Sequence, residues 1–265
     1  MTGKFLALAA TAALAFTSAA LSAADIGKGE LSARPAASVQ TLAAGETKLD
    51  SGGIIYRPAT LPAGSRPLLV LLHGHGQDNQ QFIRMLEPWA DHCGAIIFAP
   101  KAERITWDII AKAKSLESSR SAPRNAPKKF GADAGRIDGE LKSLFAAAPV
   151  DPRKVAIMGF SDGASYALSL GLPNPDLFKW VIALSPGFAL WPDKVTHSQH
   201  VFIAHGQKDQ RLAFATTRDG IVGPLKQANV PVEFREFDGD HVMVGAHIRE
   251  ALKLSTGCAR DPAPA

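Results

Sequence analysis

Short apolar runs alternate with longer stretches of helical spacing along most of this 265-residue chain. Six runs have the length and composition of strands and lead into turns rich in Gly or Pro; they are PLLVLLHG, AIIFAP, KVAIMGFS, KWVIALSPG, HVFIAHG and VEFREFD. Five of them lack the alternation of a strand with one solvated face. They therefore predict strands buried on both faces, as in a parallel sheet covered by helices.

The stretches between these runs carry the apolar spacing of helices that could cover such a sheet. They span residues 78–93, 135–148, 163–172, 214–229 and 245–257, and the last two have the weaker patterns. This order predicts an α/β fold with a doubly wound, mostly parallel sheet and helices on both faces. Upstream, residues 41–50 and 52–59 predict a short antiparallel pair.

Composition divides the chain into three parts. Residues 1–24 carry Lys4, then an apolar stretch, and then small residues near Ala23 of the kind that signal peptidases cleave. This pattern predicts a secretory signal peptide rather than a membrane anchor. Residues 25–40 hold few large apolar groups, so we expect a flexible leader. Residues 41–260 suit a single domain. The signal predicts a periplasmic or secreted protein with no stable membrane insertion after its removal.

The charge pattern gives no sign of a nucleic-acid partner. Lys and Arg total 29 against 25 Asp and Glu, which is a slight excess. A nucleic-acid-binding protein would concentrate its cations on one face, close to aromatic or groove-reading motifs. Here the richest basic run, residues 112–136, lies in one Ser- and Pro-rich segment, which predicts a solvated surface loop.

The segment VAIMGFSDGASYALSLG, residues 155–171, joins a predicted strand to a predicted helix through a tight turn. Gly159 and Gly163 flank Ser161 in a G-x-S-x-G pattern. Glycines at these places let the strand and helix approach closely and force the serine into a strained, exposed position. Because of this strand-to-helix context, the pattern predicts a nucleophilic Ser161.

A serine nucleophile needs a base to take its proton and an acid to orient that base. Asp209 follows the run HVFIAHG, and His241 follows the last strand run. Both are therefore expected at the carboxyl edge of the sheet, beside Ser161. We assign His241 as the base and Asp209 as the acid.

The other histidines and nearby carboxylates fit these two roles less well. Two histidines precede their strand, one is expected to be structural, and one falls in a helical pattern; these are His197, His200, His205 and His247. Asp219 also lies in a helical segment, and Asp238 and Asp240 are too close in sequence to His241.

Acyl transfer passes through an oxyanion, which needs backbone donors fixed in advance. The amide of Asp162, directly after the nucleophile, is one expected donor. The turn LLHGHGQD offers the second, which we assign to His75. Reading His73 and His75 as metal ligands is less favoured, because no carboxylate or cysteine cluster with ligand spacing accompanies them. We therefore expect no metal.

The segments LLHGHG, GFSDGA, HGQKD and GDH resemble, in this order, the motifs of the α/β-hydrolase superfamily, most of all its small phospholipase/carboxylesterase and dienelactone-hydrolase-like members. The resemblance covers roughly residues 55–255. It implies the α/β-hydrolase fold and a serine esterase that forms an acyl-enzyme without a metal or other cofactor. The chain differs at Asp162 and Ala164, where related sequences often have Gln or Met and a second Gly; this bears on the substrate, not on the reaction class.

Three aromatic residues near the expected site are candidates for substrate contacts. Trp107 lies in the long segment 101–136, which is expected to overhang the carboxyl edge of the sheet. Phe188 and Trp191 follow a strand end in SPGFALW. Ordinary surface packing would explain each of the three equally well.

Cys93 and Cys258 are the only cysteines, and export would take them to an oxidising compartment. In the superfamily that the chain resembles, the first and last helices cover the same face of the sheet. Cys93 closes the first predicted helix and Cys258 the last, at the edge away from the expected site. The resemblance therefore predicts a disulfide between them.

Together these features predict an exported serine hydrolase that cleaves carboxylic esters. Two other functions remain open. A polymer-directed esterase, of the polyhydroxyalkanoate-depolymerase or feruloyl-esterase type, would also suit export. A catalytically silent hydrolase fold that serves as a binding protein would carry the same fold-level pattern.

Overall fold

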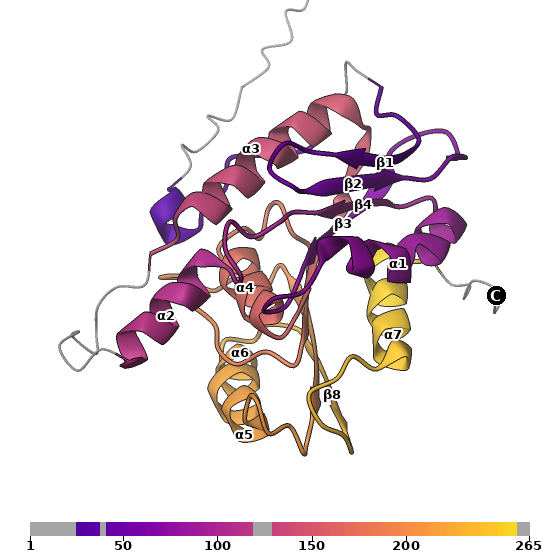
Figure 1. Ribbon diagram of the computed structural model, residues 1–265. Helices are drawn as coiled ribbons and strands as arrows, with labels where there is room; N and C mark the ends of the chain where they lie inside the picture. The colour runs from indigo at the N-terminus through magenta and orange to yellow at the C-terminus, as the bar shows by residue number, and fades with distance from the viewer. Residues whose placement is uncertain (1–24, 38–40, 119–128, 259–265) are drawn as a thin grey trace, which may run out of the picture.

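The strands that the structure describes form one eight-stranded sheet in the order β1-β2-β4-β3-β5-β6-β7-β8. Figure 1 shows β1, β2, β4 and β3 side by side in this order. The computed structural model describes residues 25–37, 41–118 and 129–258, so the predicted signal peptide at 1–24 lies outside the described residues. β2 is antiparallel to both β1 and β4, and all other neighbouring strands are parallel. The predicted mostly parallel sheet and the antiparallel pair before it are confirmed.

Each predicted apolar run forms a strand. The bounds are β1 (Gly45–Lys48), β2 (Ile54–Arg57), β3 (Arg66–Leu72), β4 (Ile96–Ala99), β5 (Val150–Phe160), β6 (Trp180–Leu184), β7 (His200–Gly206) and β8 (Val232–Phe237). Side chains alternate between two core layers: Leu68 and Val70 of β3 belong to one, and Leu69 and Leu71 to the other. Both faces are covered, so the run is apolar at every position.

Helices cover both faces of the sheet. The helical elements are η1 (Ile26–Lys28), α1 (Asn79–Cys93), α2 (Asp108–Ser118), α3 (Ala132–Ala147), α4 (Asp162–Gly171), α5 (Phe214–Thr217), η2 (Arg218–Val222), α6 (Gly223–Gln227) and α7 (Gly245–Thr256). Buried residues of α2, α3, α4 and α6 share one core layer, and those of α1 and α7 share the other. Within the ranges described above, no helix has the length and apolarity to cross a bilayer.

A disulfide joins the ends of the two helices on the second face. Cys93 is the last residue of α1, and Cys258 follows α7 by two positions. Their Cα atoms lie 5.8 Å apart and their sulfurs are bonded, so the predicted pairing is confirmed. Because α1 leads into the beginning of β4, the bond lies at the amino edge of the parallel strands.

The segment that the sequence predicts to be a flexible leader is packed against the domain over residues 25–37. Leu31 and Ala33 are buried. The Leu31 amide donates to Oδ1 of Asn174 at 2.8 Å, and the amides of Ser32 and Ala33 donate to Oδ1 of Asp138 at 2.8 and 2.7 Å. The segment is thus held through its backbone by buried polar side chains. The prediction of a flexible leader, which is based on the low content of large apolar residues, is therefore wrong for residues 25–37.

Asp138 is the main anchor of this segment. Its carboxylate also accepts from the Ser32 hydroxyl at 2.9 Å and pairs with Lys142 at 2.8 Å. Burial alone would raise the pKa of Asp138, but Lys142 and the bonds from Ala33 and Ser32 outweigh it, and the pKa lies below its usual value. The carboxylate is therefore ionised when the protein is folded at neutral pH.

We expect Asp138→Ala to lower the free energy of unfolding by about 3 kcal/mol, because several donors lose a charged acceptor at once. Urea unfolding measures the change. Asp138→Asn, which keeps one acceptor oxygen for the two amides, should lose clearly less. Equal losses for the two variants would contradict this account of the anchor.

Candidate active site

Ser161 lies in a turn between β5 and α4 that only glycines permit. A Cβ on Gly159 would lie 2.1 Å from the Gly163 carbonyl oxygen, and one on Gly163 would lie 2.1 Å from that of Leu72. Both contacts are far too short for a real side chain, so glycine is required at each position. Ser161 itself has φ 56°, ψ −121°, a conformation that costs a non-glycine residue free energy and recurs at functional sites.

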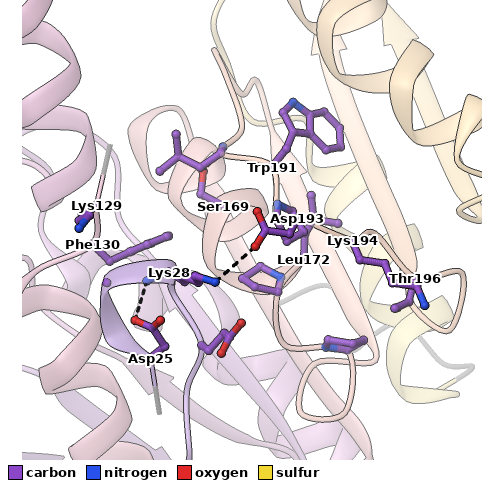
Figure 2. A pocket seen from close by; sticks show the side chains of 16 residues that line it. Asp25, Lys28, Lys129, Phe130, Ser169, Leu172, Trp191, Asp193, Lys194 and Thr196 are labelled. Atoms are coloured by element: carbon purple, nitrogen blue, oxygen red, sulfur yellow. Dashed lines mark hydrogen bonds and ion pairs between the residues drawn. The ribbon is translucent and has the colours of Figure 1, made fainter. Parts of the chain in front are cut away.

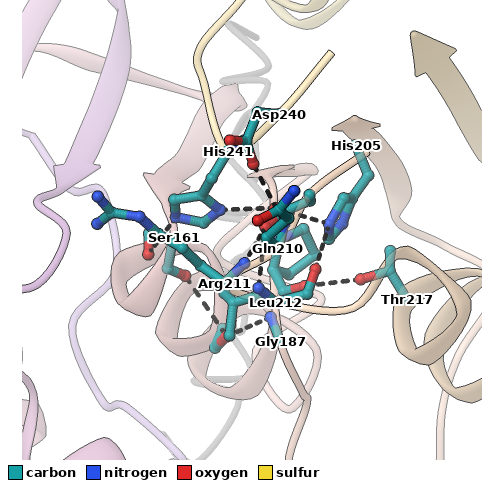
Figure 3. Close-up of polar contacts among 12 residues, drawn as sticks. Ser161, Gly187, His205, Gln210, Arg211, Leu212, Thr217, Asp240 and His241 are labelled. Atoms are coloured by element: carbon teal, nitrogen blue, oxygen red, sulfur yellow. Dashed lines mark hydrogen bonds and ion pairs between the residues drawn. The ribbon is translucent and has the colours of Figure 1, made fainter. Parts of the chain in front are cut away.

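The structure brings together the three side chains predicted to form the catalytic group; Figure 3 shows Ser161 and His241 pointing toward each other. His241 Nε2 lies 2.8 Å from Ser161 Oγ, and His241 Nδ1 lies 2.6 Å from Asp209 Oδ2. The three residues follow the carboxyl ends of β5, β7 and β8. These strand ends lie at one edge because the strands are parallel.

The proton positions follow from the partners. A carboxylate can only accept, so Nδ1 of His241 carries the proton toward Asp209. In the neutral ring, Nε2 is then unprotonated and accepts from the Ser161 hydroxyl. This is the tautomer that a base acting on Ser161 requires.

Asp209 is buried and held by backbone donors. Its Oδ1 accepts from the amides of Arg211 at 2.8 Å and Leu212 at 2.9 Å. Burial would raise the pKa of Asp209, but the Leu212 amide, His241 and the Arg211 amide together outweigh it and lower the pKa. Asp209 therefore stays ionised and can stabilise a positively charged His241.

His205 is a second, buried histidine beside Asp209. Its Nε2 lies 3.0 Å from Asp209 Oδ2 and 2.9 Å from the Leu212 carbonyl oxygen. Both are acceptors, so Nε2 carries the proton and donates to them. Burial lowers the pKa of His205, and the ring is neutral. The sequence indicates a structural role for this residue but gives no sign that it contacts the acid.

We expect His205→Leu to lower the free energy of unfolding by about 2 kcal/mol, because a buried carboxylate loses a donor. kcat should fall by about tenfold, because Asp209 orients His241 less well. Urea unfolding and steady-state kinetics measure the two effects. His247→Leu, on α7, is the control and should keep wild-type kcat. A His205→Leu enzyme with unchanged kcat would exclude any influence of this ring on His241.

The two residues predicted to supply the oxyanion donors lie side by side. Asp162 is the first residue of α4, whose first-turn amides point out of the helix N-terminus. Nδ1 of His75, in the loop after β3, lies 3.4 Å from Asp162 Oδ2. The Asp162 side chain is buried, whereas that of His75 is 49% exposed. Asp162 therefore does not present an open negative surface to a substrate.

Trp107 is not placed to contact a substrate, contrary to the sequence prediction. It is fully buried, its indole N–H donates to the His73 carbonyl oxygen at 2.8 Å, and its ring stacks on Tyr166. The prediction that segment 101–136 is a loop over the sheet edge is also partly wrong, because the segment contains α2. Ile109 and Ile110 of α2 are buried, and this apolar pair anchors the segment to the core.

The other two aromatic candidates lie in different surroundings. Trp191 is 40% exposed and lines a cleft of about 650 Å³ with Phe130 and Leu172 (Figure 2). That cleft includes Ser169, two turns of α4 beyond Ser161, but no member of the catalytic group. Trp191 is therefore placed away from the Ser161 hydroxyl. Phe188 is partly buried against the core, and its amide donates to Ser165 Oγ at 3.3 Å; its contact with substrate stays a prediction.

A mostly parallel eight-stranded sheet with serine, aspartate and histidine following its strand ends in this order defines an α/β-hydrolase. The sequence matches the phospholipase/carboxylesterase family over residues 62–253. The chain belongs to this family.

Several known proteins are similar to this chain in sequence or in fold. The S-formylglutathione hydrolase of Rattus norvegicus is 28% identical over 144 residues, which cover 50% of this chain and 50% of the rat protein. The chain is thus matched over about half the length of that relative. Esterase PE8 shares the fold with a TM-score of 0.56 at 20% identity, covering 81% of this chain and 97% of that structure. The Bacillus cereus carboxylesterase does so with a TM-score of 0.53 at 19% identity, covering 78% and 93%.

Proposed function

We propose that this protein is an exported serine hydrolase that cleaves carboxylic esters through an acyl-enzyme. The observation that carries the proposal is the continuous hydrogen-bonded chain from Ser161 through His241 to Asp209, with distances of 2.8 and 2.6 Å. Asp209 is ionised, and in a neutral His241 with its proton on Nδ1 the other ring nitrogen can accept the Ser161 proton.

In the first half-reaction, Ser161 Oγ attacks the ester carbonyl carbon while its proton passes to His241 Nε2. The imidazolium that forms is stabilised by the ionised Asp209. The carbonyl oxygen becomes an oxyanion, for which the amides of His75 and Asp162 are the donors. When the C–O bond breaks, His241 returns the proton to the departing alkoxide, and an alcohol leaves.

In the second half-reaction, a water molecule attacks the acyl-enzyme carbonyl and gives its proton to His241. The tetrahedral intermediate meets the same two amides. Its collapse breaks the bond to Ser161 Oγ, which takes the proton back from His241. The carboxylic acid is released and the resting protonation states are restored.

Two features support export. The pattern of residues 1–24 is that of a secretory signal. The bond between Cys93 and Cys258 suits an oxidising compartment, where disulfides persist. Expression of the full chain, followed by fractionation and N-terminal sequencing of the product, tests this. A product that stays in the cytoplasm with Met1 retained would contradict export.

A panel of nitrophenyl esters of graded chain length and charge tests the reaction. The same panel should include a polyester film and S-formylglutathione, the compound in the name of the rat relative. Turnover of short esters without clearing of the film is the expected result. Clearing of the film with poor turnover of short esters would favour a polymer-directed esterase. Failure of a fluorophosphonate to label Ser161 in the folded protein would favour a catalytically silent fold.

A further inference from the structure

The segment between β4 and α2 is bonded to the loop that carries His75. The Ala102 amide donates to His73 Nε2 at 3.0 Å, and the Trp107 indole donates to the His73 carbonyl oxygen at 2.8 Å. The Gly76 amide donates to the Ile105 carbonyl oxygen at 2.8 Å. These bonds flank residue 75 on both sides, so segment 102–107 fixes the course of the loop.

Thr106, in the same segment, reaches the other side of the expected oxyanion site. Its hydroxyl donates to Asp162 Oδ2 at 2.6 Å. The same carboxylate oxygen lies 3.4 Å from His75 Nδ1. Thr106 and Asp162 are both buried, with 3% and 7% of their surface exposed. Oδ2 of Asp162 therefore contacts both the buried Thr106 hydroxyl and the His75 ring. Through this atom, Thr106 is linked to both residues that are expected to supply the amide donors.

The backbone on both sides of Thr106 is bonded to a buried carboxylate of α3. The carboxylate of Asp133, at 1% exposure, accepts from the Glu103 amide and from the Asp108 amide, both at 2.9 Å. These two amides bracket Thr106 in the sequence. The position of the hydroxyl is thus set by a buried anchor that does not depend on a bound substrate.

We propose that Thr106 is a positioning residue of the oxyanion hole, which acts by holding the Asp162 carboxylate between the two amide donors. The inference rests on the proposed function. Donors stabilise an oxyanion only when they are fixed before the charge develops. With the hydroxyl removed, the carboxylate loses a buried donor, and its position beside His75 Nδ1 is held less firmly.

Thr106→Val keeps the shape of the side chain and removes the hydroxyl. We expect kcat to fall by about tenfold with KM little changed, because the donors act mainly on the transition state. The inhibition constant of phenylboronic acid, whose adduct with Ser161 places an oxygen in the oxyanion hole, should rise by a similar factor. Thr106→Ser, which keeps the hydroxyl, should restore both values.

Thr256→Val is the matched control. Thr256 is 4% exposed, and its hydroxyl donates at 2.7 Å to the Leu252 carbonyl oxygen in α7, on the other face of the sheet. Its loss should lower the melting temperature but leave kcat and boronate affinity unchanged. A fall in kcat for Thr256→Val equal to that for Thr106→Val would show that Thr106 is merely structural.

A double-mutant cycle completes the test. Asp162→Ala keeps the backbone amide but removes the carboxylate. If both residues act through one contact, Thr106→Val/Asp162→Ala should be about as slow as the slower single variant. Fully additive losses, or a Thr106→Val enzyme with wild-type kcat and boronate affinity, would overturn the inference while leaving the proposed function intact. A wild-type protein inactive on every ester and not labelled at Ser161 would overturn both.

Discussion

Ser161→Ala is expected to lower kcat by about 10⁶-fold, the largest effect of any single substitution in this chain. The variant lacks the atom that would form the proposed acyl-enzyme, and His241 has no hydroxyl to deprotonate. Some acceleration over the uncatalysed reaction should remain, because the amides of His75 and Asp162 can still stabilise an oxyanion formed by direct attack of water. Active-site titration and steady-state kinetics with a nitrophenyl ester measure the loss.

The control for this prediction is Ser198→Ala, at an exposed serine outside the site. It should keep wild-type kcat and fluorophosphonate labelling. Ser161→Ala should retain the wild-type melting temperature to within a few degrees, because alanine keeps the Cβ and therefore nearly the same packing and the same backbone strain. An Ser161→Ala protein with kcat within tenfold of wild type would require another nucleophile.

The double variant Cys93→Ser/Cys258→Ser is expected to lower the free energy of unfolding by about 5 kcal/mol, the largest stability effect we predict. The bond joins residues 165 positions apart. Closing a loop of that length by a disulfide removes much conformational entropy from the unfolded chain. Urea unfolding of the oxidised wild type and of the double variant measures the difference.

Activity separates this effect from damage to the site. The disulfide joins the ends of α1 and α7 at the amino edge of the parallel strands, whereas Ser161 lies at the carboxyl edge. kcat at low temperature should therefore be unchanged. A reductant should destabilise the wild type by the same amount and leave the double variant unaffected. A large fall in kcat in the folded variant would contradict this separation.

The fold and the convergence of three polar side chains at one edge of the sheet could be predicted because each depends on local sequence. An unbroken apolar run predicts a buried strand, and residues placed just beyond parallel strands must meet at one edge. This rule predicts the positions of Ser161, Asp209 and His241 without information on the residues that they contact.

The leader and Trp107 could not be predicted in the same way, because their positions depend on partners distant in sequence. The leader is held by Asn174 and Asp138, which lie 143 and about 105 residues further on. Trp107 bonds to a carbonyl 34 residues before it. Buried polar side chains that bind a remote backbone leave no periodic pattern, so propensity and spacing do not reveal them.

The tight approach of α4 to β3 and β5 decides where the specificity of this protein can be engineered. Codon randomisation at positions 159 and 163 should return only glycine, since a Cβ at either would lie 2.1 Å from a backbone oxygen. Libraries aimed at new acyl or alcohol groups should instead vary residues outside this turn and outside the contact between His75 and Asp162, such as the partly buried Phe188. The turn that presents Ser161 is thereby closed to diversification.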